Sequence, residues 1–300
     1  MGRTPHTRTF FAEVSMKRPG FFLLLAASLL TAWIVLLAIL SYKYVTSLTE
    51  PFCPPTLEQR PGYQPIVLQT SDGYSLRGWY RPPQNGAVII LLAGNGGSRD
   101  AMLPDAELLA RHGYGSLTLE YRNCVGGRST LGYREAEDLQ ELAKFARGQP
   151  GVKWLGVMGF SAGGVAAIRG AARTPEIQAV VSEGNYYSLD YEIRNSQAAP
   201  LTLEWQIQNL VILWYRLLDS VWPAEVNPAA DLAQLSPRPV LLVYGEGEIS
   251  NNQGYEQYDL LKPPRQLWVV PGAGHGGYSQ KCPDEYERQI VNFFDEARRP

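Results

Sequence analysis

Six short apolar runs, none of which alternates with polar residues, limit the folds open to this chain. The runs are Val88–Leu92, Ser116–Leu119, Trp154–Met158, Ala179–Ser182, Val240–Tyr244 and Leu267–Val270. Strands that are covered on both faces have this pattern, because neither face meets water. Segments of helical length separate or follow the runs, at Asp100–His112, Gly132–Arg147, Ala162–Ala172 and Asp284–Arg298. This order predicts an α/β fold: a mostly parallel sheet with helices on both faces and right-handed crossovers.

An antiparallel hairpin is predicted ahead of these runs. Ile66–Thr70 and Tyr74–Arg81 flank Ser71-Asp72-Gly73, and an Asp-Gly pair supplies the positive φ that tight turns need. We therefore expect an eight-stranded sheet with the hairpin at one edge. At 300 residues, the chain can hold one such domain and an appendage.

The apolar, uncharged stretch Phe21–Tyr42 predicts a transmembrane helix. At 1.5 Å per residue it extends roughly 33 Å, which is enough to cross the hydrocarbon core. A cleaved secretory signal is the alternative, but its apolar core is only about 7–15 residues long and precedes a small-residue cleavage site, which is not evident here. Basic residues are more numerous before the stretch than after it, where chiefly Lys43 follows. The positive-inside rule then predicts a cytoplasmic N-terminus, with the rest of the chain outside.

These signals divide the chain into four parts: a cytoplasmic tail (1–20), the transmembrane helix (21–42), a proline-rich linker (43–62) and a folded domain (63–300). Proline has no backbone N–H and cannot complete the regular hydrogen bonds of a helix or a sheet. We therefore expect the linker to be a stiff spacer. The prolines are Pro51, Pro54, Pro55 and Pro61.

Charge and cysteine content narrow the possible partners. The chain has 27 Lys and Arg residues and 29 Asp and Glu residues, so its net charge is −2. This charge gives no electrostatic reason to expect binding to nucleic acid, and small neutral or amphiphilic partners fit better. Cys53, Cys124 and Cys282 have neither CxxC spacing nor a neighbouring histidine cluster, so no zinc site or redox pair is indicated. We expect inert thiols rather than a disulfide, because sequence spacing does not establish proximity.

The strongest local motif is Gly159-Phe160-Ser161-Ala162-Gly163-Gly164, which lies directly between an apolar run and a helical segment. So tight a strand-to-helix turn forces its central residue toward positive φ and brings two backbones together, which only small neighbours tolerate. The turn presents the serine Oγ at the carboxyl edge of the sheet, with the helix dipole aimed at developing negative charge. Ser161 is therefore the predicted nucleophile. A chance GxSxG match among 29 glycines is the alternative.

His275 is the predicted general base. In this arrangement the base follows the nucleophile along the chain, and His275 is the only histidine after Ser161. It lies in a glycine-rich turn after the last apolar run, from which an imidazole can reach back over the sheet edge. His6 and His112 are interpreted as solvated or helix-terminal residues.

The acid is expected after the run PVLLVY. Glu248 is the first choice, because a carboxylate there would meet His275 Nδ1 and fix its tautomer. Glu246 is a close rival and Glu183 the third candidate. A solvated loop carboxylate is the alternative interpretation of each.

The glycine-rich run Leu91–Ser98 is the predicted oxyanion loop. Backbone N–H groups of Asn95 and Ala162 could both point at the oxygen of a tetrahedral intermediate. A phosphate-binding loop is the competing interpretation, but no GK[ST] follows, which argues against a nucleotide site.

Together these motifs resemble the α/β-hydrolase superfamily, and within it the membrane-anchored Bem46-like and serine aminopeptidase-like serine hydrolases. The resemblance covers about Tyr63–Arg298 and rests on AGNGG, where the family often has HGNGG, on GYGSLTLEYRNCVGG, and on GFSAGG, RPVLLVYGEGE and GAGHGG. It implies an α/β-hydrolase fold with Ser161 as nucleophile, Glu248 as acid, His275 as base, and Asn95 and Ala162 as oxyanion donors.

Three features depart from the family pattern. Ala93 replaces the usual histidine, Asn123 and Cys124 interrupt the usual Arg-Gly turn, and the acid is Glu248 rather than the commoner aspartate.

Residues 185–236 form a predicted insertion. Its apolar part, 201–218, includes polar side chains that argue against a second membrane span, because burying them in lipid would cost several kcal/mol. These are Glu204, Gln206, Gln208, Asn209 and Arg216. One interpretation is a cap over the active site, with an apolar pocket lined by Trp205, Trp214, Tyr215 and Trp222. The other is ordinary packing against the sheet.

The predicted function is hydrolysis of a carboxylic ester, thioester or amide through an acyl-enzyme, by a membrane-anchored serine hydrolase that needs no metal or organic cofactor. The expected substrate is a small or lipid-like acyl compound. The alternative is a catalytically silent, membrane-tethered binding or scaffold protein of the same fold. Peptidase activity would need a pocket for a free amino terminus, and no acidic pair in the sequence clearly provides one.

Overall fold

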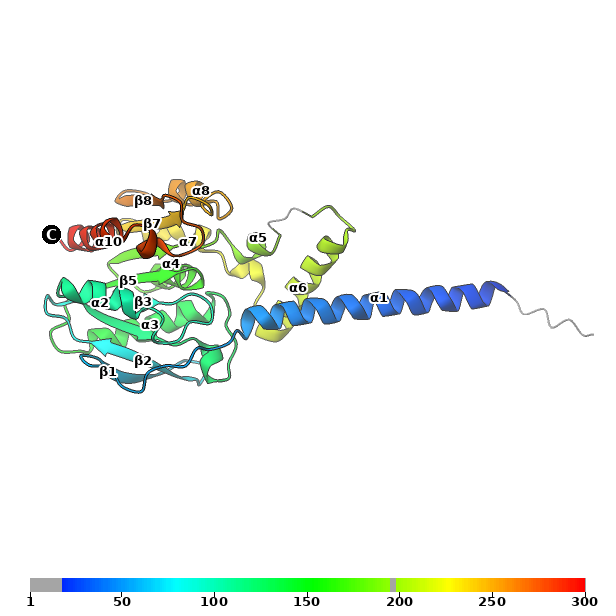
Figure 1. The fold of residues 1–300 in the computed structure, drawn as a ribbon, viewed down its shortest axis with the longest axis horizontal. Coiled ribbons are helices and arrows are strands. Elements are labelled where there is room, and N and C mark those ends of the chain that lie inside the picture. The colour runs from blue at the N-terminus through cyan, green and yellow to red at the C-terminus, as the bar shows by residue number, and fades with distance from the viewer. Residues whose placement is uncertain (1–17, 195–197, 300) are drawn as a thin grey trace, which may run out of the picture.

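A computed structural model describes residues 18–194 and 198–299 and contains one eight-stranded sheet (Figure 1). The spatial order is β1-β2-β4-β3-β5-β6-β7-β8. The strands β1 and β2 form the antiparallel hairpin at one edge, β2 is antiparallel to β4, and the remaining neighbours are parallel. The strands are β1 Gln64–Gln69, β2 Ser75–Arg81, β3 Ala87–Leu92, β4 Gly115–Leu119, β5 Trp154–Phe160, β6 Ala179–Glu183, β7 Val240–Gly245 and β8 Arg265–Val270. The predicted fold class and edge hairpin are confirmed.

Helices cover both faces of the sheet, which explains the unbroken apolar runs. In β3, Ile89 and Leu91 pack with helices α2 (Leu103–Arg111) and α10 (Pro283–Ala297). Val88, Ile90 and Leu92 point the other way. They pack toward α3 (Arg134–Arg147), α4 (Ala162–Arg173) and α7 (Pro228–Leu235). Because successive strand residues face opposite sides, both sides of a doubly covered strand have to be apolar.

The remaining elements are short, apart from two helices. Helix α1 (Arg18–Thr49) precedes the sheet, and α6 (Leu203–Asp219) lies in the predicted insertion. The short elements are η1 (Arg122–Val125), α5 (Leu189–Arg194), η2 (Pro223–Glu225), α8 (Gly254–Leu260) and α9 (Tyr278–Lys281). Within the described residues, α1 is the one helix long and apolar enough to cross a membrane.

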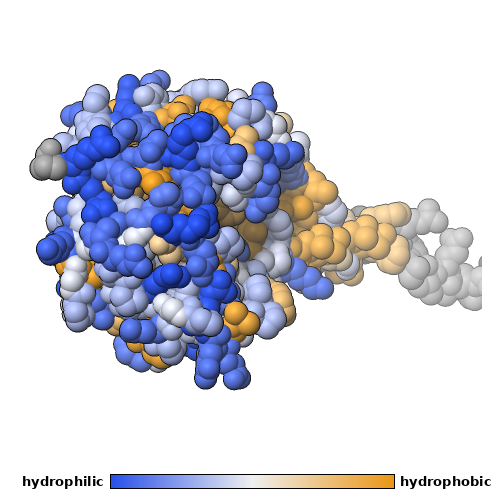
Figure 2. All heavy atoms as spheres, turned by 60° about the vertical axis from the view of Figure 1, so that its left-hand side comes forward, coloured by the Kyte–Doolittle hydropathy of each residue, from blue (hydrophilic) through white to orange (hydrophobic). Residues whose placement is uncertain are grey.

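Helix α1 is longer than the predicted span. It continues past Tyr42, so residues 43–49 are helical rather than part of an irregular linker. The extension packs on the domain: Val45 is buried in a cluster with residues from α4 and α6. Pro51 follows closely, and a proline disfavours helix in the residue before it. Most apolar side chains of α1 between Phe21 and Tyr42 are exposed, with Leu37 a buried exception, and Figure 2 shows apolar residues of this helix projecting from a largely hydrophilic domain.

Helix α6 lies alongside α1 (Figure 1), and the two are joined by side-chain hydrogen bonds. The indole Nε1 of Trp214 donates to the carbonyl of Ala38 and to Ser41 Oγ, each at 3.1 Å. Tyr215 is buried and donates to the Thr130 carbonyl. The expectation of a pocket lined by Trp205, Trp214, Tyr215 and Trp222 is therefore wrong, because Trp214 packs on α1, Tyr215 packs inside the domain, and Trp222 is 47 % exposed.

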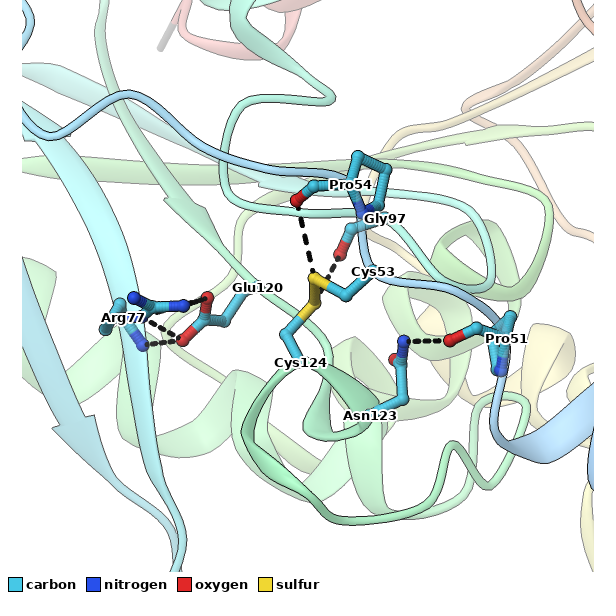
Figure 3. Close-up of a disulfide and its surroundings, with 8 residues drawn as sticks. All are labelled: Pro51, Cys53, Pro54, Arg77, Gly97, Glu120, Asn123 and Cys124. Atoms are coloured by element: carbon cyan, nitrogen blue, oxygen red, sulfur yellow. Dashed lines mark hydrogen bonds and ion pairs between the residues drawn. A yellow bond between two sulfur atoms is a disulfide. The ribbon is translucent and has the colours of Figure 1, made fainter.

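The expectation of three inert thiols is also wrong, since Cys53 and Cys124 form a disulfide with a Cα–Cα distance of 5.2 Å (Figure 3). The linker folds back over η1, which carries Cys124, although 71 positions separate the two cysteines. Only the path of the linker brings them together, so no local pattern could predict the pair. Cys282 is free.

Candidate active site

Ser161 lies in the tight turn between β5 and α4, with φ of +54° and ψ of −120°. This left-handed φ is rare for a non-glycine residue and is characteristic of a nucleophile elbow. Its neighbours are glycines for a steric reason: a Cβ on Gly159 would lie 2.1 Å from the Gly163 carbonyl oxygen, and one on Gly163 would lie 2.2 Å from that of Leu92. The backbone N–H of Ser161 donates to the Glu183 carbonyl at 2.7 Å, which ties the turn to β6.

His275 lies above this turn and joins Ser161 to Glu248. Its Nε2 is 3.0 Å from Ser161 Oγ, and its Nδ1 is 2.6 Å from Glu248 Oε2. The Phe160 ring packs against the imidazole, with ring centroids 4.9 Å apart. The hydrogen bond to Glu248 raises the pKa of His275 above its usual value, while partial burial acts in the opposite direction. Three residues far apart in the sequence thus form one continuous hydrogen-bonded chain.

Glu248 is the carboxylate that contacts the histidine. It is 6 % exposed and follows β7. Besides His275, it accepts hydrogen bonds from the Gly245 N–H at 2.9 Å, from Asn252 Nδ2 at 3.1 Å and from the Tyr278 hydroxyl. These donors supply the hydrogen-bond partners that a buried carboxyl group needs.

The two other candidate acids lie elsewhere. Glu246 is exposed and accepts from the Gly272 N–H at 2.9 Å. Glu183 is buried at the end of β6, and its carboxyl group lies with Asp105 and Tyr286 at a cleft beside Phe160. Burial, reinforced by Asp105, raises the pKa of Glu183 well above its usual value. Neither carboxylate is hydrogen-bonded to His275 in the described residues.

Tyr278 is a site residue that the sequence analysis missed. It begins the short helix α9, just after the glycine-rich turn of His275, and its hydroxyl donates to Glu248 Oε1. Burial, together with the Glu248 charge, raises the pKa of the Tyr278 hydroxyl, so it stays a donor. The sequence offered one signal, namely that Tyr278 follows His275 by three residues. No spacing rule assigns a role to a tyrosine at that position, so the signal was not specific.

The predicted oxyanion loop lies against the serine turn. A Cβ on Gly94 would be 2.9 Å from the Phe160 ring and 3.5 Å from Ser161 Cβ. Asn95 follows in the same loop, and Ala162 is the first residue of α4, where a backbone N–H has no partner within the helix. Ala93 occupies the family's histidine position, and its carbonyl accepts from the Tyr121 hydroxyl at 2.6 Å.

The end of α1 and the linker hold this loop from outside. The Asn95 side-chain amide donates to the Leu48 carbonyl at 2.7 Å. A Cβ on Gly96 would lie 2.9 Å from the Pro51 ring, so the linker passes directly over the loop. Beside it, the Cys124 Sγ lies 4.0 Å from the Gly97 carbonyl oxygen, and Asn123 donates to the Pro51 carbonyl at 2.9 Å (Figure 3). Asn123 and Cys124, the two residues that depart from the family pattern here, therefore both contact the linker.

A cavity of about 460 Å³ lies between α1, α5 and α6. Glu192 of α5 lies in its wall, and its charge and that of His275 influence each other's pKa. The part of the chain that the structure describes holds no cluster of three or more histidine, cysteine or acidic side chains suited to a metal.

The sheet topology and the serine turn at the carboxyl end of β5 define the α/β-hydrolase class of fold. The chain belongs to the alpha/beta hydrolase family, whose model matches residues 89–289.

Three proteins, one curated and two with solved structures, illustrate the likeness. An uncharacterized protein, YfhR of Escherichia coli O157:H7, is 26 % identical over 249 residues, which is 78 % of this chain and 81 % of YfhR. The esterase Pf2001 of Pyrococcus furiosus is 26 % identical, with a TM-score of 0.65 over 82 % of this chain and 97 % of the esterase. A dienelactone hydrolase from Anabaena variabilis, 18 % identical over 79 % of this chain and 99 % of its own, shares the fold with a TM-score of 0.56.

Proposed function

We propose that this protein is a serine hydrolase that cleaves carboxylic esters, and by the same steps thioesters or amides, through an acyl-enzyme intermediate. The observation that carries the proposal is the hydrogen-bonded chain from Ser161 through His275 to the buried Glu248. The base lies within hydrogen-bonding distance of both the nucleophile and the orienting acid, which is the arrangement that activates a serine. The likeness to an archaeal esterase supports the same chemistry.

The proposed first half-reaction forms the acyl-enzyme. Ser161 Oγ attacks the substrate carbonyl while His275 Nε2 takes the hydroxyl proton. Glu248 stabilises the imidazolium that results, and the backbone N–H groups of Asn95 and Ala162 hold the oxyanion. The tetrahedral intermediate then collapses, breaking the bond to the leaving group, and His275 returns its proton to that group.

The second half-reaction repeats these steps with water. His275 removes a proton from a water molecule, the hydroxide attacks the acyl carbon, and the bond to Ser161 Oγ breaks as the serine regains its proton. The products are a carboxylic acid and the alcohol, thiol or amine. These steps need no metal or organic cofactor.

We further propose that α1 anchors the domain to a membrane by a single span. The most apolar 18-residue window within Gly20–Thr49 has a mean hydropathy of 2.7, and the exposed face of the helix there is apolar. The Cys53–Cys124 disulfide supports a domain outside the cytoplasm, because structural disulfides persist in oxidising compartments. Of the flanking basic residues, Arg3, Arg8 and Lys17 lie outside the described residues. An alkaline phosphatase fused to the C-terminus, which is active only outside the cytoplasm, should be active; an inactive fusion would reverse the orientation.

The decisive experiment is labelling of the purified full-length protein with a fluorophosphonate, which reacts with activated serines. Wild type should label, whereas Ser161→Ala and His275→Ala should not, because the first lacks the nucleophile and the second the base. Ser71→Ala, in the exposed hairpin turn, is the matched control and should label like wild type.

The alternative proposal, a catalytically silent scaffold, predicts the opposite result. Folded wild-type protein that neither labels nor hydrolyses a short-chain ester would favour it. Labelling that persists in Ser161→Ala would place the reactive serine elsewhere.

A further inference from the structure

A cleft of about 270 Å³ lies beside Phe160, the residue that precedes the proposed nucleophile. The residues at its base are Glu183, Tyr278 and Tyr286, and each is 3 % exposed. Gln280 also lines the cleft and is exposed, so the cleft is open to solvent. A small ligand can therefore reach a base that contains a buried acidic residue.

Two carboxyl groups line this cleft without a positive charge to balance them. Asp105 of α2 accepts a hydrogen bond from the Tyr286 hydroxyl at 2.8 Å. A hydroxyl has one proton to donate, and Glu183 Oε1, which is buried, has no hydrogen-bond partner. In the part of the chain that the structure describes, neither carboxyl group pairs with a lysine, arginine or histidine. Buried carboxyl oxygens ordinarily have donors, so Glu183 Oε1 marks a position where a ligand can supply one.

The other groups in the cleft suit an organic cation. The aromatic residues Phe160, Tyr278 and Tyr286 line it, and the faces of aromatic rings attract cations. An ammonium group has three N–H donors and can contact both carboxyl groups at once. A metal ion fits less well, because no cluster of three or more histidine, cysteine or acidic side chains suited to a metal occurs among the described residues.

We propose that this cleft binds a primary ammonium group, which donates hydrogen bonds to Glu183 and Asp105. The proposal goes beyond the hydrolase function, because binding needs neither Ser161 nor His275. Phe160 nevertheless connects the two sites, since its ring packs against the His275 imidazole, with ring centroids 4.9 Å apart, and Phe160 also lines the cleft. The ammonium group therefore belongs either to the substrate or to a free amine that binds beside the catalytic residues.

Isothermal titration calorimetry on the full-length protein tests binding directly. The probe is n-butylammonium, and n-butanol is its neutral analogue of similar size. Wild type should bind butylammonium saturably and should not bind butanol. Glu183→Gln and Asp105→Asn each remove one charge with little change of shape, and each should weaken the affinity by about tenfold or more. Glu141→Gln is the matched control, because Glu141 pairs with Lys144 on α3, which covers the other face of the sheet. It should bind like wild type.

The absence of saturable binding to wild type would overturn the proposal, as would equal affinities in wild type and the two cleft variants. Circular dichroism checks that each variant folds. Because Asp105 is on α2 and Glu183 is on β6, one variant remains as a test if the other does not fold. A failure of wild type to react with a fluorophosphonate would reject the serine hydrolase function and would leave the binding result intact.

The pH dependence of binding is a second measurement, and it needs no variant. Burial raises the pKa of both carboxyl groups, and the charge of Asp105 raises the pKa of Glu183 further. The other titratable groups that influence Glu183 are Tyr286 and Glu248, and Tyr278 lies beside it in the cleft. None of these groups becomes positively charged. Protonation of the two carboxyl groups should therefore weaken butylammonium binding as the pH is lowered. An affinity that does not fall would place the ammonium group elsewhere and overturn the proposal.

Two nitrophenyl esters identify the source of the ammonium group. One carries a 6-aminohexanoyl group, and the other carries a heptanoyl group, which has the same length and no charge. If the substrate supplies the ammonium group, wild type should prefer the amino ester. Glu183→Gln should then lower the ratio of the two kcat/KM values by about tenfold or more. Equal kcat/KM values for the two esters, together with saturable binding of butylammonium, would show that a free amine is the ligand.

Discussion

The Glu248 carboxylate has hydrogen-bond donors on both oxygens, and this determines how His275 behaves. The Gly245 N–H and the Tyr278 hydroxyl satisfy one oxygen, while Asn252 and His275 share the other. A carboxylate that accepts a hydrogen bond from Nδ1 favours the imidazolium form of the histidine. The pKa of His275 is raised as a result, mainly through this hydrogen bond.

The first prediction concerns the pH dependence of hydrolysis. His275 acts as a base only when neutral, so activity should rise with pH through its pKa, and the acid limb of kcat/KM should lie above pH 6.5, the unperturbed value. Glu248→Gln removes the charge that raises this pKa, so the limb should move to lower pH. The maximal kcat should fall by as much as about 10⁴-fold, because an amide can stabilise the wrong imidazole tautomer.

The pH profile and an NMR titration of the His275 ring protons together check this prediction. Glu246→Gln is the control, because that exposed carboxylate contacts Gly272 rather than His275. A limb that stays in place in Glu248→Gln, or that moves equally in Glu246→Gln, would show that Glu248 is not the partner that governs His275.

Among the elements, the end of α1 and the linker are part of the active-site structure. The Leu48 carbonyl holds the Asn95 side chain, Pro51 covers Gly96, and the disulfide fastens the linker beside Gly97. The proposed oxyanion loop is therefore fixed between the sheet and the segment that follows α1. The linker is better described as a clamp on this loop than as a spacer.

The second prediction is that loss of the disulfide lowers both stability and catalysis. Cys53→Ser should reduce the free energy of unfolding by about 2–4 kcal/mol, because the cross-link closes a long loop in the unfolded chain. The kcat for a soluble ester should also fall, since the oxyanion loop loses its outer support. Thermal melts and ester kinetics, with and without reductant, measure both effects.

Cys282→Ser is the matched control, because Cys282 is free and should be neutral in both assays. Reductant should lower the melting temperature of wild type and of Cys282→Ser, but not of the Cys53→Ser, Cys124→Ser double variant. Wild-type protein should also be denatured with reductant before the melt, so that the reductant reaches the disulfide. An unchanged melting temperature after this treatment would contradict the role assigned to the disulfide.

At the scale of the whole molecule, helix α1 and the α/β-hydrolase domain share one core. Val45 is 1 % exposed and packs with Val165 of α4 and Val211 of α6. The Ser129 N–H donates to the Thr49 carbonyl at 2.7 Å, and Arg128 contacts both Thr49 and Glu50. Removing α1 therefore exposes a face of the domain that is buried in the complete protein.

The third prediction follows from this shared core. A chain that begins at residue 50 should melt at a lower temperature than the full-length protein, because the domain loses buried apolar contacts. It should also aggregate more, because the apolar surface that α1 covers becomes exposed. Circular dichroism and size-exclusion chromatography in the same detergent compare the two. A chain that begins at residue 43 keeps Val45 and Thr49 and should lie between them. Equal melting temperatures for all three would mean that α1 is only a tether.

Local sequence pattern determined the strands, the main helices of the sheet and the positions of Ser161, His275 and Glu248. Strand and helix periodicity and the glycines around a tight turn are properties of neighbouring residues, so they can be read along the chain. The choice of Glu248 over Glu246 and Glu183 needed the structure, because all three lie near the ends of β6 and β7 and only side-chain direction separates them.

The remaining features depend on contacts between distant segments. Cys53 meets Cys124, Trp214 meets Ala38, and Glu192 comes near His275 only after the linker and the insertion have folded back onto the domain. No local rule predicts such pairs, because the path of an irregular segment is set by the surface on which it packs. The sequence by itself therefore determined the class of fold and the candidate catalytic residues, whereas the tertiary structure alone decided how helix α1 joins the candidate site.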